Sequence, residues 1–586
     1  MESPKNSNIE FISNLEIPMR DGTKTFCDLY LPKSENSTPV LLQRTPYNKS
    51  SPQSRSGSSV DPIIAAQNGF ATVIQDVRGR FSSHGEFYPL INEIDDGYDS
   101  IEWISNQNWS DGKVGMYGGS YVGATQWLAA ISGHPALSAI APSVTASNYH
   151  DGWTWQGGAF SLGFNLSWAI GALTLDNFEN IKRNSNDNLN AQTVENLIHS
   201  KDNLSELFEY LPMKNLPDLK DGLAEYYYDW LAHPEYDEFW KNISIEENYH
   251  KISIPSLNIG GWYDIFLNGT LSNYIGMKKN APMSSSKLIM GPWVHASNPT
   301  EIAGNFNFGT KASAGYINLQ ETILDFFNHW LKPTLYQPEN LKPVKIFVMG
   351  ENKWRNEDNW PLERAIQTKF YLHSLGNSNS VAGDGKLSLN FPMHEKEDTF
   401  VYDPGNPVPT IGGGLCCNPS FMAPGAFDHS AIETREDVLI YSTDPLEKPL
   451  EVTGPIKLHV FISSSAKDTD FTAKLLDIEP CGYARNLTDG IIRGRFRNTN
   501  QGASLLNPGQ IYQLEINLGA TSNLFLKGHQ IRLEISSSNF PRFDRNSNTG
   551  GEIGEEKTFV KATQKIFHDK NSPSHIVLPI IKQHPK

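Results

Sequence analysis

A serine in a glycine-rich turn is the residue in this sequence best placed to do chemistry. The apolar run Val114–Tyr117 leads into Gly118-Gly119-Ser120-Tyr121, and a helix-like segment follows over residues 122–130. A serine between a strand and a helix is held in a strained backbone conformation that exposes its hydroxyl. The pattern predicts a nucleophile elbow at Ser120. A plain strand-to-helix turn is the alternative, because Val122 occupies the place of the usual second glycine.

Two candidate partners follow later strands, in the chain order serine, acid, histidine that such sites use. Asp264 comes just after a predicted strand over residues 256–260, and His295 just after another over 287–290. An imidazole can accept and return the serine proton, and a carboxylate holds the ring in the useful tautomer. Either residue alone could be an ordinary loop residue. Because both fall at the required strand ends, we predict a catalytic triad of Ser120, Asp264 and His295.

An oxyanion hole for this serine needs two hydrogen-bond donors. The amide after the nucleophile, that of Tyr121, is the first candidate. The second donor often comes from a His-Gly-rich loop after an earlier strand, but the sequence there is Arg44-Thr45-Pro46-Tyr47. A phenol can replace the missing amide, so we expect the Tyr47 hydroxyl to be the second donor, with a packed loop tyrosine as the alternative.

The segments around these residues predict two domains and a cap. Strand-like runs alternate with helical stretches over residues 1–150 and 251–363, which is typical of a parallel sheet covered on both faces. Residues 151–250 are rich in aromatic and charged residues without β-like alternation, so we expect an inserted helical cap. Residues 364–586 return to short alternating runs between turn residues, which favours a β sandwich or jelly roll.

Composition narrows the function further. The net charge of −16 comes without a basic cluster, so we expect no nucleic-acid partner. No apolar run approaches the ~18 residues of a membrane helix, and the polar N-terminus lacks a signal core. If the chain is the full translation product, we expect a cytoplasmic protein that does not bind membranes. Four scattered cysteines predict inert thiols, and no spacing resembles a zinc site, so we expect no metal or cofactor.

Five motifs together resemble one superfamily of serine hydrolases: Arg44-Thr45-Pro46-Tyr47, Asp76-Val77-Arg78-Gly79, the elbow at residues 118–123, Gly261-Trp262-Tyr263-Asp264 and Gly291-Pro292-Trp293-Val294-His295. Over essentially its full length the chain is similar to the superfamily of cocaine esterase, α-amino-acid ester hydrolase, glutaryl cephalosporin acylase and Xaa-Pro dipeptidyl-peptidase. The resemblance implies an α/β-hydrolase domain with an inserted helical cap and a C-terminal β jelly roll. It implies the same triad, with the Tyr47 hydroxyl and Tyr121 amide as oxyanion hole. It also implies that Asp76 and Arg78 fix the loop beside the elbow.

The resemblance also bears on the substrate. Trp153, Trp168 and Phe266 resemble the aromatic residues that line the acyl pocket of cocaine esterase, although ordinary core aromatics would look the same. We therefore expect a serine hydrolase that forms an acyl-enzyme from a small-molecule ester, or an amide, with an apolar or aromatic acyl group. The natural substrate, the leaving group and the oligomeric state, monomer or homo-oligomer, stay open.

Other functions compete with this one. α-Amino-acid ester hydrolases and cephalosporin acylases of the superfamily hold an ammonium group with acidic residues after the triad aspartate, where this chain has Ile265, Phe266 and Leu267. Asp151 alone supports that specificity. Xaa-Pro dipeptidyl-peptidases carry an additional N-terminal domain that is missing from this sequence. A carbohydrate- or partner-binding protein with a dormant hydrolase domain is the alternative from another class, and the presence of every triad position argues against it.

Overall fold

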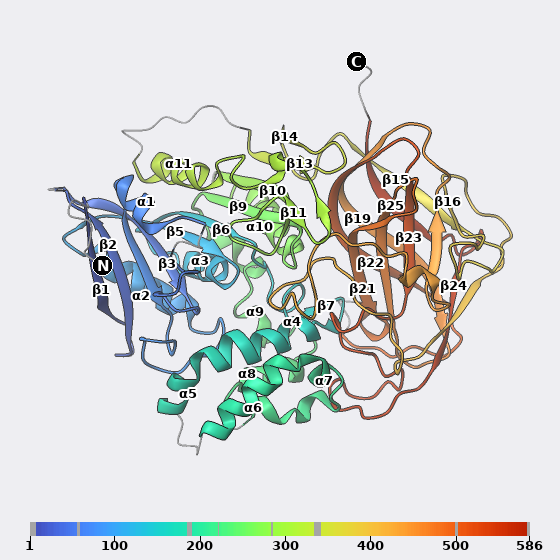
Figure 1. The fold of residues 1–586 in the computed structure, drawn as a ribbon, viewed down its shortest axis with the longest axis horizontal. Helices are drawn as coiled ribbons and strands as arrows, with labels where there is room; N and C mark the ends of the chain where they lie inside the picture. Colours follow the sequence, from blue (N-terminus) through green and yellow to red (C-terminus); the bar gives the residue numbers. More distant parts are fainter. Residues whose placement is uncertain are drawn as a thin grey trace.

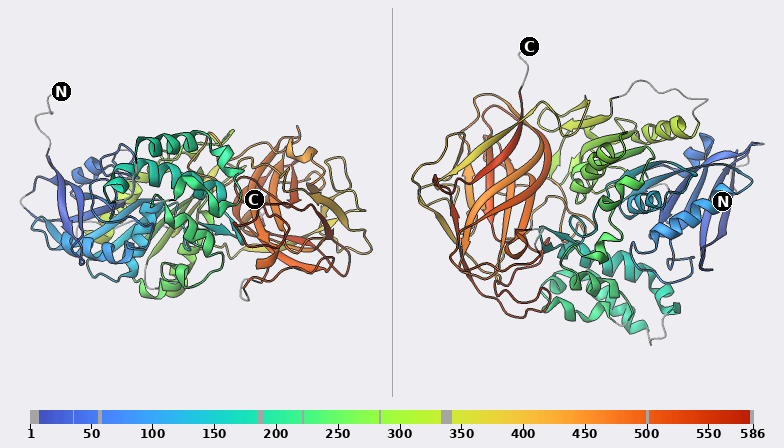
Figure 2. Two further views of the ribbon diagram at one scale, coloured as in Figure 1. Left: turned by 90° about the horizontal axis from the view of Figure 1, so that it is seen from below. Right: turned by 180° about the vertical axis from the view of Figure 1, so that it is seen from behind.

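The computed structural model describes residues 8–34, 36–55, 59–184, 190–220, 222–282, 285–332, 342–498 and 502–582. An α/β domain, a mainly helical cap and a β-rich domain lie side by side (Figure 1). The view from behind in Figure 2 shows the cap helices next to both domains. The predicted fold class, an α/β hydrolase with a cap and a C-terminal jelly roll, is confirmed. None of the helices in the described segments combines the length and the apolar character needed to cross a membrane.

A ten-stranded sheet forms the α/β domain, in the order β1-β2-β4-β3-β5-β6-β9-β10-β13-β14. Neighbours from β4 to β13 pair in parallel, whereas β1–β2, β2–β4 and β13–β14 are antiparallel. The strands are β1 (Ile9–Pro18), β2 (Lys24–Pro32), β3 (Thr38–Thr45), β4 (Ala71–Asp76), β5 (Ser110–Gly119), β6 (Leu137–Ser143), β9 (Ser256–Tyr263), β10 (Ser286–Val294), β13 (Val344–Val348) and β14 (Lys353–Glu357). The sequence analysis missed β14, because its polar, partly exposed residues show no apolar alternation.

Helices cover both faces of this sheet, as the alternation along β5 shows. Met116 packs with Trp127 in one hydrophobic cluster, whereas Tyr117 packs with Phe327 in another on the opposite face. Successive side chains of a strand point to opposite faces, so a central strand buried on both is apolar almost throughout. The helices of this domain are α1 (Pro62–Gln67), α2 (Glu93–Ser105), α3 (Tyr121–Ile131), α10 (Leu267–Asn280) and α11 (Leu319–Leu331), with the short elements β11 (Ile302–Ala303), β12 (Phe306–Asn307) and η6 (Thr310–Ala312).

The cap is inserted between β6 and β9, and it begins with a two-stranded hairpin that the sequence analysis did not predict. Its elements are β7 (Trp155–Gln156), β8 (Ala159–Phe160), α4 (Leu162–Ser167), η1 (Trp168–Thr174), η2 (Leu175–Asn177), α5 (Phe178–Asn184), α6 (Ala191–Asp202), α7 (Leu204–Phe208), η3 (Met213–Asn215), η4 (Pro217–Leu219), α8 (Glu225–Ala232), α9 (Glu238–Lys241) and η5 (Glu246–Lys251). The segment η1 is a π-helix, a conformation that occurs frequently at functional sites.

The β-rich domain is an eleven-stranded array whose first strand is β15. Strand β17 shows the alternation typical of a half-buried strand, with Phe400 buried and Val401 exposed. The strands are β15 (Ala365–His373), β16 (Lys386–Ser388), β17 (Asp398–Tyr402), β18 (Leu439–Ser442), β19 (Leu450–Ser464), β20 (Asp470–Ile478), β21 (Ala484–Arg493), β22 (Tyr512–Phe525), β23 (Gln530–Ser536), β24 (Ala562–Phe567) and β25 (His575–Ile581), with the short helices η7 (Ile432–Thr434) and η8 (Gly494–Phe496).

The β-rich domain shares its core with the α/β domain. Trp262 at the end of β9 belongs to the same hydrophobic cluster as the inner residues of β19 and β22. The neighbouring Tyr263 donates its hydroxyl to the carbonyl of Asn486 in β21, at 3.0 Å. Because Tyr263 directly precedes Asp264, the β-rich domain helps to fix the position of that carboxylate.

A buried ion-pair cluster joins the β-rich domain to the cap hairpin. Arg493 is 2% exposed, and its guanidinium binds Asp470 and Asp544, each at 2.9 Å. One carboxylate oxygen of Asp544 also accepts a hydrogen bond from the Phe160 amide of β8, at 2.8 Å. The cation thereby neutralises two buried carboxylates and connects β21 to the base of the cap.

Replacing Arg493 with methionine should lower the free energy of unfolding by about 3–5 kcal/mol, because two buried carboxylates lose their shared cation. Chemical denaturation of the full chain measures this change. Lys457→Met is the matched control, since it removes an exposed pair with Glu515 in the same domain and should cost less than about 1 kcal/mol. Equal costs for the two variants would contradict the stabilising role of the buried cluster.

Candidate active site

Ser120 lies in a strained turn between β5 and α3. Its backbone angles, φ 62° and ψ −127°, fall in a region that residues other than glycine rarely adopt. The Ser120 amide donates to the carbonyl of Ser143, at the end of the neighbouring strand β6, at 3.0 Å. The turn is thus held by the edge of the sheet, as the elbow prediction requires.

The glycines around Ser120 are required by close packing. A Cβ on Gly118, where φ is 124°, would lie 2.4 Å from Cγ1 of Val122, and a Cβ on Gly123 would lie 2.8 Å from Cβ of Thr145. The small residue is therefore needed at position 123, where the helix touches the segment after β6. Position 122 can hold a valine, which lines the cavity described below.

Asp264 and His295 meet at the carboxyl-terminal edge of the sheet. They follow the neighbouring parallel strands β9 and β10, and Nδ1 of His295 lies 2.7 Å from Oδ1 of Asp264. The aspartate side chain is fully buried, whereas the imidazole is 13% exposed. A carboxylate at Nδ1 fixes the ring orientation and makes Nε2 the nitrogen available for proton transfer.

Ser120 and His295 line the same cavity, which has a volume of about 640 Å³. Its wall combines apolar and polar side chains, and the lining residues are Gln43, Thr45, Tyr47, Asn48, Ser51, Gln53, Ser54, Phe81, Gly119, Ser120, Val122, Val144, Trp168, Ala172, Asp176, His295, Ala296, Ser297 and Cys417. Among the described residues that line it, Asp176 is the only carboxylate, and none is a lysine or an arginine. Within the described segments, no group of three or more His, Cys, Asp or Glu side chains could hold a metal ion.

The Tyr47 hydroxyl lies beside Ser120 in this cavity. It accepts a hydrogen bond from the indole nitrogen of Trp168, at 3.1 Å, and the Ser120 side chain lies close enough to influence its pKa. Burial raises the pKa of the Tyr47 phenol, against the opposing effects of Trp168, Ser120 and the Arg80 charge. The phenol is therefore neutral at physiological pH and can act as a hydrogen-bond donor.

The loop that carries Tyr47 is tied to the loop after β4. Asp76 accepts a hydrogen bond from the Lys49 amide, at 2.7 Å, and another from the Ser82 hydroxyl, also at 2.7 Å. Arg78 forms ion pairs with Asp96 and Asp21, each at 2.6 Å. Both residues make structural contacts in the loops next to the elbow, and neither lines the cavity.

Tyr121 is the first residue of α3, so its amide precedes the first hydrogen bond of the helix, in which the Ala124 amide donates to the Ser120 carbonyl. The side chain points the other way and is fully buried. Its hydroxyl donates to Glu93 at 2.8 Å and accepts from the Leu90 amide at 2.9 Å. The side chain thus anchors the start of the helix that follows Ser120.

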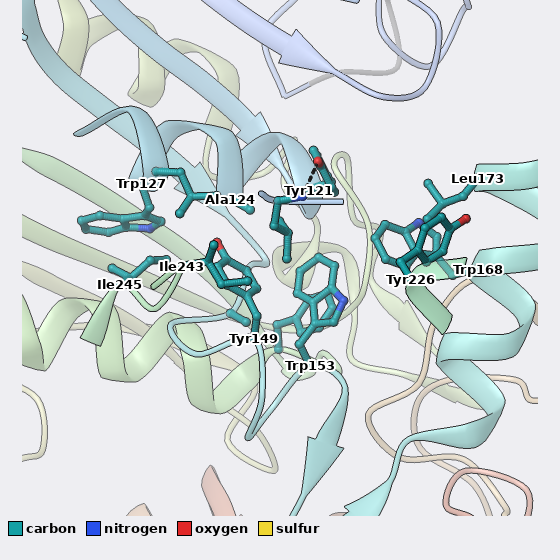
Figure 3. Packing of buried hydrophobic residues seen from close by; sticks show 14 of the residues in the cluster. Tyr121, Ala124, Trp127, Tyr149, Trp153, Trp168, Leu173, Tyr226, Ile243 and Ile245 are labelled. Carbon is teal, nitrogen blue, oxygen red and sulfur yellow. Dashed lines mark hydrogen bonds between the residues drawn. The ribbon is translucent and has the colours of Figure 1, made fainter. Parts of the chain in front are cut away.

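The three predicted substrate aromatics form one cluster, but only Trp168 lines the cavity. Trp153 and Phe266 stack face to face, with ring centroids 4.3 Å apart, and the Phe266 ring lies edge-on to His295 at 5.3 Å. Figure 3 shows Trp153, Trp168 and Tyr121 in the packed layer between α3 and the cap. Trp153 therefore packs against Trp168, and Phe266 packs against the imidazole of His295, without lining the cavity themselves.

The prediction that the cysteines are free thiols is wrong for two of the four. Cys416 and Cys417 form a disulfide, whereas Cys27 and Cys481 are free. Cys416 is buried in the main core, and Cys417 lines the cavity, where its backbone has a φ of 76°. Two adjacent cysteines were the available signal in the sequence, but only the folded loop shows that one lines the cavity and the other is buried.

Thiol titration tests this pairing. The unfolded protein, kept away from reductants, should react with two equivalents of a thiol reagent because only Cys27 and Cys481 are free. After reduction all four cysteines should react. Cys416→Ser should leave three reactive thiols without any reductant, and four thiols in the untreated wild type would refute the disulfide.

Comparisons with known proteins show the family of the chain. Residues 21–297 match the family model described as X-Pro dipeptidyl-peptidase (S15 family), and residues 337–577 match that of the X-Pro dipeptidyl-peptidase C-terminal non-catalytic domain. The chain is 39% identical to a cocaine esterase of Rhodococcus sp. over 98% of its own length and 99% of that protein.

Two solved structures resemble the whole chain at 25% identity. An aminopeptidase from a marine sediment Thaumarchaeota archaeon has a TM-score of 0.80, with 99% of both chains covered. An α-amino acid ester hydrolase has a TM-score of 0.81, with 99% of this chain and 98% of that chain covered. The chain therefore belongs to the family of serine ester hydrolases that includes cocaine esterase and the X-Pro dipeptidyl-peptidases (S15 family).

Proposed function

We propose that this chain hydrolyses carboxylic esters through an acyl-enzyme formed on Ser120. The observation that carries the proposal is that His295, paired with the buried Asp264, lines the same cavity as the strained turn of Ser120. A free hydroxyl is a poor nucleophile at neutral pH, so it needs a base within reach. Nε2 of His295 is the candidate base, and Asp264 stabilises the imidazolium that forms.

The reaction has two stages. Ser120 Oγ attacks the ester carbonyl while His295 takes its proton, and a tetrahedral intermediate forms. As the intermediate collapses, His295 returns that proton to the alcohol, which leaves. Water then attacks the acyl-enzyme in the same way, with His295 again as the base, and the carboxylic acid is released.

Two donors face the place where the negative charge develops. The Tyr121 amide begins α3, and the Tyr47 oxygen already accepts a hydrogen bond from Trp168, so its own proton is directed elsewhere. Within the described segments the Ser120 side chain lies near the Tyr47 phenol, and no hydrogen bond joins it to His295. We infer that the substrate carbonyl takes the place of the serine at Tyr47 and that the freed hydroxyl turns to His295, since catalytic hydrogen bonds often tighten only when the substrate is bound.

The acyl group is proposed to be apolar or aromatic. Val122 and Val144 line the cavity next to the elbow, and Trp168 adds an aromatic face. Polar residues, among them Asn48 and Gln53, line other parts of the wall and suit a more polar leaving group. The name of the cocaine esterase relative also supports an ester as the substrate.

Turnover of an α-amino-acyl ester is the second candidate, supported by the likeness to an α-amino acid ester hydrolase and by the cavity-lining carboxylate of Asp176. The residues after Asp264 are Ile265 and Phe266, and an ammonium group placed against them would lack a counter-charge. A panel of esters with one leaving group and benzoyl, butyryl, glutaryl or phenylglycyl acyl groups distinguishes the two. We expect benzoyl and butyryl to have the highest kcat/KM.

A fluorophosphonate probe tests the nucleophile. Wild-type protein should be labelled at Ser120, and Ser120→Ala should lose both the label and esterase turnover, because Ser120 is the one serine among residues 118–123. Ser297→Ala, which changes another serine in the cavity wall, is the control and should keep the label. Full labelling of Ser120→Ala would remove the assigned nucleophile.

Tyr47→Phe tests the oxyanion hole. Loss of one donor should lower kcat by 10²–10³-fold, or roughly 3 kcal/mol, with little change in KM, because the hydrogen bond strengthens in the transition state. Steady-state kinetics with an activated ester measures both parameters. Undiminished kcat with intact Ser120 labelling would remove Tyr47 from the mechanism and leave the nucleophile in place.

A further inference from the structure

Arg80 is a fully buried cation next to the proposed oxyanion hole. It lies in the loop after β4 and is 0% exposed. Burial lowers the pKa of its guanidinium to about 10, so the group stays charged at neutral pH. A charge buried in this way is costly unless its hydrogen bonds are satisfied, which makes its partners informative.

The partners of this guanidinium are backbone carbonyls. Nε donates to the carbonyl of Pro46 at 2.7 Å, Nη1 to that of Leu173 at 2.5 Å, and Nη2 to that of Ala172 at 2.8 Å. Its Cζ also lies about 5 Å from two aromatic rings, 4.9 Å from that of Phe81 and 5.0 Å from that of Phe87. In the described part of the chain Arg80 forms no ion pair, so its positive charge is not neutralised by direct contact.

These contacts connect the two segments that hold the Tyr47 hydroxyl. Pro46 directly precedes Tyr47 in the loop after β3. Ala172 and Leu173 lie in the last turn of the π-helix η1, which begins with Trp168, the donor to the Tyr47 oxygen. Figure 3 shows Trp168 and Leu173 close together in this part of the cap. One planar guanidinium therefore fixes the distance between the Tyr47 loop and the helix of its partner.

We propose that Arg80 is a positioning residue of the oxyanion hole, which holds the Tyr47 hydroxyl in place by clamping its loop to the π-helix of the cap. This proposal rests on the role of Tyr47 proposed above. The fork of the guanidinium supplies three fixed donors, which a lysine ammonium on a flexible stem cannot reproduce with the same geometry. Misplacement of a catalytic group by about 1 Å can cost ~10²-fold in rate.

The charge of Arg80 also favours hydrogen-bond donation by Tyr47. It opposes the rise in the pKa of Tyr47 that burial causes, which makes the phenol a stronger donor. The effects of geometry and charge can be separated with Arg80→Lys, because a lysine keeps the positive charge but loses most of the hydrogen-bond geometry of the guanidinium.

A double-mutant cycle on the full-length enzyme tests the proposal. The variants are Arg80→Met, Tyr47→Phe and the double mutant, and the readouts are kcat and KM for an activated ester. Arg80→Met should lower kcat about 10- to 100-fold with less than about threefold change in KM. In the Tyr47→Phe background the same substitution should lower kcat less than about threefold, since the group that Arg80 positions is already gone.

Arg80→Lys and Arg78→Met are the companion variants. Arg80→Lys should recover part of the kcat lost in Arg80→Met, because the charge is restored. Arg78→Met removes ion pairs from the same loop and should lower the melting temperature without coupling to Tyr47. Labelling of Ser120 by the fluorophosphonate probe reports whether each variant has a folded active site.

The outcomes separate the two proposals. Equal losses from Arg80→Met in the wild-type and Tyr47→Phe backgrounds would overturn the positioning role, and so would a loss confined to KM or to the melting temperature. If Tyr47→Phe itself keeps full activity, the proposed oxyanion hole fails, whatever Arg80 does. If Arg80→Met does not fold, the cycle is run with Arg80→Lys. Equal losses of kcat from Arg80→Lys in the wild-type and Tyr47→Phe backgrounds would then overturn the positioning role.

Discussion

The active site depends on the backbone of one turn, in which Ser120 is held at a positive φ. Three constraints keep it there: a hydrogen bond from its amide to β6, and the close approaches at Gly118 and Gly123. Such a conformation persists only where the surroundings over-determine it. Because β5, β9 and β10 belong to one parallel sheet, their ends lie along one edge, and the same sheet places Asp264 and His295 beside the turn.

A second layer of contacts joins the parts of the chain that this sheet does not position. The Tyr47 loop is bound on one side by Asp76 and on the other by Trp168 of the cap, while Arg80 links the loop and the cap directly. From the β-rich domain, the carbonyl of Asn486 accepts a hydrogen bond from the hydroxyl of Tyr263, next to Asp264. All three parts of the fold therefore contribute to the geometry of one cavity.

The sequence predicts best what depends on local pattern. The elbow, the strand ends before Asp264 and His295, and the all-β texture after residue 364 are local features, and the fold class derived from them is confirmed. It predicts poorly what depends on packing between distant segments. The stack of Trp153 on Phe266 and the clamp made by Arg80 need the cap to be in place, and the sequence around Arg80 gives no sign that this cation is buried.

The disulfide is a second feature that the local sequence pattern does not predict. Adjacent cysteines at positions 416 and 417 could be two free thiols as far as local pattern is concerned, and only the folded loop shows them joined. The short strand β14 was missed for a related reason, because its pairing with β13 and not its own residues defines it. Local sequence pattern therefore predicts the ends of the central strands, whereas pairing and packing between distant segments need the folded structure.

A crystal structure of the protein after reaction with a small fluorophosphonate would test the convergence of these residues most directly. The account predicts a bond from phosphorus to Ser120 Oγ, with the phosphoryl oxygen about 2.7–3.1 Å from both the Tyr47 hydroxyl and the Tyr121 amide. It also places Nε2 of His295 on the leaving-group side. A phosphoryl oxygen turned away from both donors, or an adduct on another residue, would contradict it.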